Sequence, residues 1–360
     1  MSASFVLGPP KESAGSMFLK SQFRQVAIVT GSTSGLGLDA SRQLLSLGLS
    51  GLMIAVRSTE KGEQIASTFR AQYPKVNIQV WFLETESYDS IQAFTHRADA
   101  ELSRLDIAIL NAAMQVLYFT TAPTTGHEKL VQVNYLSTML LAVLLLPVLK
   151  AKSPPGKTGR LTVVSSGTVR GATISGPRDA PVLPALDDKS RLWNPVERYA
   201  VSKLLGHLFM INLVDYISAD HVVVNLVDPG LVKGTNLQRG GPLLLSAFFY
   251  RFKAVFGRTV PVGASTYIDA AVVKGKETHG CYVADWKISP FAAFVYSPKG
   301  EAIREQLWKE TMAEFEFAGV QKILDDLKNC AAPGPLDNAP DSSRRVSEIE
   351  GPDGNVPSGM

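Results

Sequence analysis

Short apolar runs recur along the chain and are separated by longer stretches of helical periodicity. The runs lie at 26–30, 52–56, 76–82, 106–110, 161–165, 221–227 and, as the weakest of them, 281–284. Unbroken apolar strands that alternate with helices are typical of a parallel sheet buried on both faces. We therefore predict an α/β fold, a doubly wound (Rossmann) parallel sheet of about seven strands in a single domain.

The pattern changes at both ends of this domain and once inside it. Residues 1–22 and 329–360 are rich in Gly, Pro, Ser and charge, which predicts a flexible N-terminal arm and a disordered C-terminal tail. The domain then spans 23–328, with helical periodicity from 297 to its end. Inside it, 167–198 is rich in Gly, Pro, Asp and Arg, and we predict a long insertion that is functional or disordered.

Two apolar stretches bear on membrane contact and assembly. The run 136–149 has 14 residues, fewer than the roughly 20 that span a bilayer, which predicts a buried core helix. The part around 140–146 would serve a homodimer interface as readily as a core. Residues 241–257 contain Arg251 and Lys253 and predict an amphipathic lid or interfacial helix. The N-terminus shows no secretory signal pattern, so we expect a cytoplasmic protein, with peripheral contact to an intracellular membrane as the alternative.

Composition narrows the partners. The 36 Lys and Arg residues nearly balance 33 Asp and Glu residues, and the net charge of +3 gives no reason to expect nucleic acid. Cys281 and Cys330 are too few for a disulfide framework, and the five histidines lack the spacing of metal ligands. We therefore expect a reduced intracellular protein with no metal.

A glycine turn follows the first apolar run. Gly31, Gly35 and Gly37 lie between this run and a helical stretch that begins near residue 38. Glycines let the backbone approach a pyrophosphate, and the free N–H groups and dipole of a helix N-terminus attract the anion. The spacing differs from the common Gly-x-Gly-x-x-Gly fingerprint, and glycines alone could also serve a tight turn without a ligand.

Six segments in order resemble the motifs of the short-chain dehydrogenase/reductase family over roughly residues 24–325. The segments are Thr30 to Gly37, Asn111-Ala112-Ala113, Asn134, Val164-Ser165-Ser166, Tyr199 with Lys203, and Asp228-Pro229-Gly230. Ala113 departs from the glycine that the family has there. Finer features are similar to the retinol-dehydrogenase-like branch and to fungal reductases of secondary metabolism. These features are Ala55 to Ser58 with Lys61-Gly62, Gly126-x-Glu128, the long insertion, and Arg258-Thr259.

The resemblance implies that Asn134, Ser166, Tyr199 and Lys203 form the catalytic set of a carbonyl reductase. A tyrosine has a pKa of about 10, and a lysine cation four residues later on one helix face would lower it. Ser166 would hydrogen-bond the substrate oxygen, and Asn134 would fix a water that links Lys203 to solvent. Without the other motifs, the Tyr199–Lys203 pair could equally be structural.

The resemblance also implies a nicotinamide cofactor. NAD-binding chains usually carry an acid after the second strand, whereas this chain has Arg57 with Lys61 nearby, which favours a ribose phosphate and therefore NADP (NADPH). Ser32 or Thr33 would bind the same phosphate, and Glu84 would lie near the adenine. The full cofactor set is Gly31, Ser32, Thr33, Gly35, Leu36, Gly37, Arg57, Lys61, Glu84, Asn111, Tyr199, Lys203, Val232 and Thr235.

We expect an enzyme that interconverts a hydrophobic ketone or aldehyde and its alcohol, in secondary metabolism of polyketides or terpenoids. A retinoid or steroid dehydrogenase is the alternative. The substrate pocket would comprise the insertion 167–198, a lid at 232–260, and Leu117, Tyr118 and Phe119. A catalytically silent dinucleotide-sensing protein is a rival from another class, and an epimerase of the extended branch would need a Gly-x-x-Gly-x-x-Gly loop, which this chain lacks.

Overall fold

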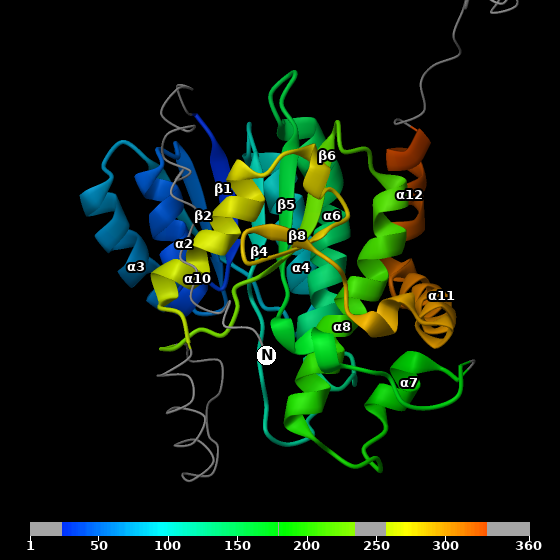
Figure 1. Cartoon of the computed structure of the whole chain (residues 1–360). Coiled ribbons are helices and arrows are strands. Elements are labelled where there is room, and N and C mark those ends of the chain that lie inside the picture. Colours follow the sequence, from blue (N-terminus) through cyan, green and yellow to red (C-terminus); the bar gives the residue numbers. More distant parts are fainter. Residues whose placement is uncertain (1–23, 179, 235–256, 330–360) are drawn as a thin grey trace, which may run out of the picture.

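The computed structural model describes residues 24–178, 180–234 and 257–329. They form one eight-stranded sheet in the order β3-β2-β1-β4-β5-β6-β7-β8, with helices on both faces (Figure 1). The strands are β1 Val26–Thr30, β2 Gly51–Val56, β3 Asn77–Phe82, β4 Ile107–Leu110, β5 Gly159–Val164, β6 Val222–Asp228, β7 Tyr282–Ala284 and β8 Lys287–Ser289. The predicted doubly wound sheet is confirmed, and each predicted apolar run contains a strand.

The sheet has eight strands where about seven were predicted. The additional strand, β8, pairs antiparallel with β7 after a turn in which Asp285 and Trp286 have positive φ. Its three residues, Lys287–Ser289, alternate polar and apolar and therefore present no apolar run to find in the sequence.

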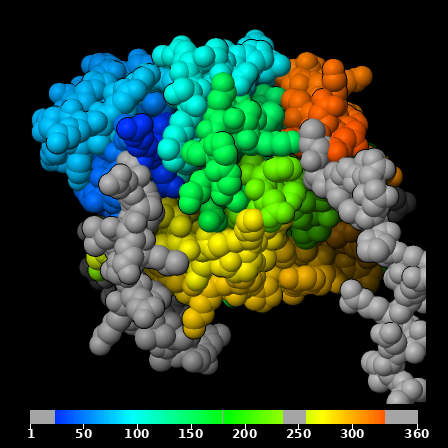
Figure 2. Space-filling model, turned by 90° about the horizontal axis from the view of Figure 1, so that it is seen from above, coloured from blue at the N-terminus to red at the C-terminus, as the bar shows by residue number. Residues whose placement is uncertain are grey.

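Helices cover the two faces unequally. The helices are α2 Gly35–Ser46, α3 Thr59–Gln72, α4 Tyr88–Glu101, α5 Lys129–Val131, α6 Thr138–Lys152, α7 Val182–Asp187, α8 Pro195–Leu213, α10 Val260–Ile268, α11 Pro298–Glu314 and α12 Val320–Asn329. Apolar residues of α2, α3 and α10 fill one core, and those of α4, α6, α8, α11 and α12 fill the other. Viewed from above, the yellow segment that contains α10 lies against the blue N-terminal part (Figure 2).

The apolar run 136–149 lies in a continuous helix, Lys129–Lys152, which is long and apolar enough to cross a membrane by length and composition alone. The most apolar window of this helix is 89% buried within the fold, so the predicted core helix is confirmed. Leu140, Leu145 and Leu146 are fully buried. These three side chains therefore belong to the core, while the use of this helix as a homodimer interface stays a prediction.

The insertion 167–198 has more structure than a loop. It holds a 3₁₀ turn at Gly167–Gly171, helix α7 and the first residues of α8. Helix α7 packs against α11, away from the sheet (Figure 1). The helical C-terminal region is confirmed as α11 and α12, with Ile303 and Leu307 buried.

Several predictions fall on residues that the structure does not describe. They are the arm at 1–22, most of the lid at 232–260, the amphipathic segment at 241–257 up to residue 256, Thr235, and the tail apart from residue 329.

Candidate active site

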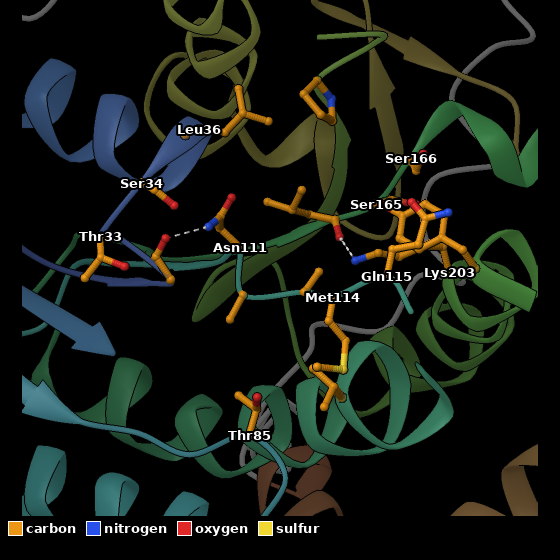
Figure 3. A pocket seen from close by; sticks show the side chains of 18 of the residues that line it. Thr33, Ser34, Leu36, Thr85, Asn111, Met114, Gln115, Ser165, Ser166 and Lys203 are labelled. Atoms are coloured by element: carbon orange, nitrogen blue, oxygen red, sulfur yellow. Dashed lines mark hydrogen bonds between the residues drawn. The ribbon is translucent and has the colours of Figure 1, made fainter. Parts of the chain in front are cut away.

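The carboxyl ends of the parallel strands open into a cavity of 820 Å³. It lies where the strand order reverses between β1 and β4, the switch point at which doubly wound sheets bind ligands. Twelve of the predicted site residues line it, namely Gly31, Thr33, Gly35, Leu36, Arg57, Lys61, Glu84, Asn111, Ser166, Tyr199, Lys203 and Val232. Figure 3 shows Thr33 and Ser34 on one side of Asn111, and Ser165, Ser166 and Lys203 on the other.

The glycine turn after β1 needs glycine for two reasons. Gly31 and Gly35 have φ of +69° and +58°, in the left-handed region that side chains disfavour. At Gly37 a Cβ would lie 2.5 Å from both the carbonyl oxygen of Gly31 and Nδ2 of Asn111. Asn111 Nδ2 in turn donates to the Thr30 carbonyl at 2.9 Å and so holds the turn against the end of β4.

The N-terminus of α2 opens on this cavity and fits a pyrophosphate. Ser34, its N-cap, makes no side-chain capping hydrogen bond, and the first turn carries no acidic residue. The N–H groups of the first turn and the Ser34 hydroxyl can therefore bind an anion, which the helix dipole also favours. Because this helix N-terminus has no side-chain cap, it can bind the pyrophosphate of a dinucleotide in the cavity.

The part of the cavity near the N-terminus of α2 also carries positive charge. Arg57 follows β2, and its side chain is 69% exposed, with Nε 3.8 Å from Glu84 Oε2. Lys61 lies in the first turn of α3 and is exposed. Glu84 also accepts a hydrogen bond from the backbone N–H of Glu86 at 3.0 Å. Arg57 and Lys61 therefore present two cations to a phosphate, and Glu84 fixes the loop beside them.

Among the described residues, two of those predicted to bind the cofactor do not line the cavity. The Ser32 side chain is fully buried, and its hydroxyl donates to the Val29 carbonyl at 2.6 Å. The prediction that this hydroxyl binds the ribose phosphate is wrong, because the turn directs it inward, whereas Thr33 does line the cavity. Gly37 is also absent from the lining because it is packed behind Gly31.

Helix α8 places Tyr199 and Lys203 one turn apart, facing Ser166 at the end of β5. The helix begins at Pro195, and the Asn194 side chain caps it by accepting from the N–H groups of Val196 and Glu197. Lys203 Nζ donates to the Val164 carbonyl at 2.9 Å. The structure thus brings together three of the four predicted catalytic residues on one cavity wall.

Burial sets the protonation of the catalytic pair. It raises the pKa of Tyr199 to about 12, against the lowering effect of a hydrogen bond with Ser166. It lowers the pKa of Lys203 to about 8. The sequence predicted a lowered tyrosine pKa, and the structure shows the opposite because burial disfavours the phenolate. Tyr199 is therefore protonated near neutral pH and can donate a proton.

Asn134, the fourth predicted catalytic residue, lies behind the cavity wall in a π-helical stretch, Gln132–Ser137. Its Nδ2 donates to the Met114 carbonyl at 2.9 Å and to Ser202 Oγ at 3.0 Å, and its Oδ1 accepts from Met114 N–H at 2.9 Å. Asn134 thereby fixes Met114, which lines the cavity, against helix α8. Its link to Lys203 through a water stays a prediction.

The sequence reasoning assigned no role to several buried polar residues near the site. Tyr267 Oη donates to Asn111 Oδ1 at 3.2 Å, and nothing in the sequence pattern points to it. Asp228 ends an apolar strand, which is an unusual place for a carboxylate, and His207 follows Lys203 at the same spacing of four. Asp228 and His207 could therefore have been singled out from the sequence. Within the described ranges, no group of His, Cys, Asp and Glu side chains could hold a metal ion.

A doubly wound sheet with a glycine turn, a serine and a Tyr-Lys pair on one cavity is the arrangement of a dinucleotide-dependent oxidoreductase. A family model described as short chain dehydrogenase matches residues 25–176. The chain is 52% identical over 307 residues to the short chain dehydrogenase/reductase mfmJ of Annulohypoxylon moriforme, a match that covers 84% of this chain and 88% of that protein. The chain belongs to the short-chain dehydrogenase/reductase family.

Other similarities agree with this assignment. The short chain dehydrogenase virL of Hypocrea virens is 41% identical over 306 residues, covering 84% of this chain and 89% of the relative. Among solved structures, the Pseudomonas aeruginosa RhlG/NADP active-site complex aligns with a TM-score of 0.54 and 21% identity, over 72% of this chain and 94% of that chain. A short chain dehydrogenase of Shigella flexneri complexed with NADP aligns with a TM-score of 0.52, 18% identity, and coverage of 73% and 98%. Both structural matches show the fold alone.

Proposed function

We propose that the protein is an NADPH-dependent reductase that interconverts a hydrophobic ketone or aldehyde and its alcohol. The observation that carries the proposal is the shared cavity, with the free N-terminus of α2 and Arg57 at one end and Tyr199 with Ser166 at the other. An anion-binding helix end and a proton donor on one cavity are what hydride transfer to a carbonyl requires.

Ser166, Tyr199 and Lys203 each have a separate role in the proposed proton transfer. Bound NADPH supplies the hydride. Ser166 hydrogen-bonds the carbonyl oxygen and holds it at Tyr199, whose phenol donates the proton to the developing alkoxide. Lys203 lies one turn along the same helix, and its cation stabilises the phenolate that remains. In the reverse direction the same phenolate accepts the proton of the alcohol.

The choice of NADPH rests on charge at the end of β2. Arg57 is largely exposed and faces the cavity, and the guanidinium matches phosphate oxygens with two parallel hydrogen bonds. Lys61 adds a second cation from the first turn of α3. A ribose without the phosphate would offer these two cations no anionic group to bind.

Apolar side chains around the catalytic end favour a hydrophobic substrate. Met114, Val196 and Leu231 line the cavity, whereas Leu117, Tyr118 and Phe119, which the sequence predicted there, lie outside its lining. The fungal origin of the relatives supports a polyketide or terpenoid carbonyl of secondary metabolism as the substrate class. A retinoid or steroid carbonyl, the substrate class of the retinol-dehydrogenase-like branch, is the alternative.

We place the protein in the cytoplasm, with peripheral contact to an intracellular membrane as the alternative, and we propose a homodimer. The small net charge of +3 supports the absence of a nucleic-acid partner.

The first test is a fluorescence titration of the protein with NADPH and NADH, repeated on Arg57→Glu. We expect the affinity for NADPH to fall at least about tenfold, since a hydrogen-bonded charge pair is lost, and the affinity for NADH to change little. Arg97→Glu, on helix α4 outside the cavity lining, is the matched control and should bind NADPH as the wild type does. Unchanged NADPH binding in Arg57→Glu would contradict the choice of cofactor.

A second measurement tests the reaction. NADPH oxidation is followed with a panel of lipophilic ketones and aldehydes, and Tyr199→Phe should lose about 10²- to 10⁴-fold in rate while it still binds NADPH. If the wild type binds NADPH but turns over no carbonyl in the panel, the silent dinucleotide-sensing alternative is supported. If it binds neither nucleotide, the oxidoreductase proposal fails.

A further inference from the structure

Four buried polar residues lie next to the catalytic pair and are not used in the chemistry above. Asp228 ends β6, Tyr282 begins β7, His207 lies on α8, and Ser165 follows β5. Asp228 is only 7% exposed, and His207 and Tyr282 are fully buried. An unpaired buried donor or acceptor is costly, and each of these side chains makes at least one hydrogen bond, although His207 Nδ1 has no partner among the described residues. We call these four residues the rear network.

Asp228 joins two turns that border the cavity. Its Oδ1 accepts from the N–H of Gly230 at 2.9 Å, and its Oδ2 accepts from Tyr282 Oη at 3.1 Å. Burial raises the pKa of Asp228, whereas the backbone N–H of Gly167 lies near enough to the carboxylate to lower it. A Cβ on Gly167 would lie 2.9 Å from Asp228 Oδ2, so the turn after Ser166 approaches the carboxylate closely.

The two joined turns lie at the catalytic end of the cavity. Ser166 lines the cavity immediately before Gly167, and Pro229 and Gly230 line it immediately after Asp228. The two turns follow β5 and β6, which are neighbours in the sheet, so their spacing is short enough for one carboxylate to bridge. Loss of the bridge would release both turns at once.

His207 completes the rear network from the helix side. It follows Tyr199 and Lys203 at the same spacing of four, so all three lie on one face of α8. Its Nε2 lies 2.6 Å from Ser165 Oγ, and its ring centroid is 4.8 Å from that of Tyr282. Burial, with a smaller effect from Lys203, lowers its pKa to about 3, so the ring is neutral and its hydrogen bond is constant at working pH.

We propose that Asp228 is a positioning residue that ties the serine turn after β5 to the Pro229–Gly230 turn after β6, so that together they hold the nicotinamide half of the dinucleotide. This inference rests on the proposed function only in that it takes the ligand to be a dinucleotide. It predicts that substitution of Asp228 weakens binding of the nicotinamide half of the ligand and not of the adenosine half. Binding of the adenosine half, at Arg57 and the N-terminus of α2, does not depend on Asp228.

The test compares two ligands on Asp228→Asn, which keeps the shape of the side chain and removes its charge and one acceptor oxygen. The affinity for NADPH, measured by fluorescence titration, should fall about tenfold, the size expected for weakened hydrogen bonds to a charged group. The affinity for adenosine 2′,5′-bisphosphate, measured by calorimetry, should stay within about twofold of the wild type. Equal losses for the two ligands would indicate a general structural role and overturn the inference.

Asp106→Asn is the matched control. Asp106 is also buried and also accepts a backbone N–H, from Val26 at 2.8 Å, but it lies at the amino end of the sheet. Neither affinity should change in this variant unless the fold itself is lost. Tyr282→Phe is the second variant, because it removes one donor and leaves the Asp228 charge in place. It should weaken NADPH by a smaller factor, again without effect on the bisphosphate, and it decides the question if Asp228→Asn does not fold.

Hydrogen exchange followed by mass spectrometry gives a readout that needs no ligand. In Asp228→Asn, peptides that contain Gly167 and Gly230 should exchange faster, while those of β1 and β4 keep their protection. Unchanged exchange at both turns, together with wild-type affinity for NADPH, would overturn the inference. If the wild type binds neither ligand, the proposed function fails, and the exchange data still decide whether Asp228 ties the two turns.

Discussion

At the residue scale, burial rather than spacing decides how the catalytic pair is protonated. Tyr199 and Lys203 are 8% and 5% exposed, and burial disfavours the charged form of each. The pKa of the phenol therefore rises to about 12, while the pKa of the ammonium falls to about 8. Nearby Asp228 also raises the pKa of Tyr199. The pair is thus set to donate a proton at neutral pH.

This protonation predicts the pH dependence of reduction. The pKa of Lys203 lies below its ordinary value, so the cation is present below pH 8 and is lost above it. We expect kcat/KM for carbonyl reduction to fall about tenfold per pH unit above this pKa. Tyr199 stays protonated over the same range and contributes nothing to the decline.

The Lys203→Arg variant tests whether Lys203 is the group whose ionisation lowers kcat/KM near pH 8. A guanidinium has a pKa above about 12 and therefore stays charged over the whole pH range of the assay. The fall of kcat/KM near pH 8 should therefore be absent in the variant, whatever its absolute rate. A pH profile of NADPH oxidation over pH 6 to 10 measures it. An unchanged decline in Lys203→Arg would assign the ionisation to another group.

At the element scale, His127 links helix α7 of the insertion to helix α11. His127 Nδ1 lies 2.7 Å from Asp187 Oδ2 on α7, and its Nε2 lies 3.2 Å from Glu314 Oε1 on α11. Tyr88 Oη donates to Glu314 as well, at 3.0 Å. Glu310, also on α11, accepts from the N–H groups of Val182 and Leu183 at the start of α7. Helix α7 therefore depends on α11 for its place.

The charge of His127 predicts how stability varies with pH. Burial alone would lower its pKa, but the hydrogen bonds and charges of Asp187 and Glu314 raise it to about 9. Because the folded pKa exceeds the ordinary 6.5, the stabilisation is complete below pH 6.5 and is lost as pH rises through 9. His127→Gln should therefore lower the free energy of unfolding by about 2 kcal/mol at pH 6.

Denaturant unfolding at pH 6, 8 and 10 measures this effect. The difference between wild type and His127→Gln should shrink with rising pH and be smallest at pH 10. His96→Gln, an exposed histidine on α4, is the control and should match the wild type throughout. A constant difference between wild type and His127→Gln at all three pH values would show that shape, and not charge, joins α7 to α11.

At the scale of the whole molecule, helix α6 is the centre of one of the two cores. Leu146 is fully buried in it, among residues from α4, β5 and α12. Leu146→Ala should lower the free energy of unfolding by about 2–5 kcal/mol, the cost of a cavity in a core. Leu192→Ala removes a side chain that is 96% exposed and should cost little.

Sedimentation of the same two variants distinguishes a core from an interface. Because Leu146 has no exposed surface, Leu146→Ala should leave the oligomeric state unchanged while it lowers stability. A change in mass with no loss of stability would place this helix at a contact between subunits.

Much of the fold could be predicted because its signals are local. A strand buried on both faces must be apolar throughout, so seven strands were found from their runs of apolar residues. The glycine turn and the pair Tyr199 and Lys203 were found because their geometry follows from spacing along one segment. Their convergence on one cavity then follows from the topology of the sheet.

Only the tertiary structure decided the rest, because those features depend on residues far apart in sequence. Asp228 lies close to Gly167, which follows the neighbouring strand of the sheet. His127 contacts Glu314, which is far from it in the sequence. The inward turn of the Ser32 hydroxyl and the protonation of Lys203 depend on depth of burial, which no pattern of residue types records. The sequence by itself therefore determined the fold, the family and the set of chemical groups, while packing determined their orientation and charge.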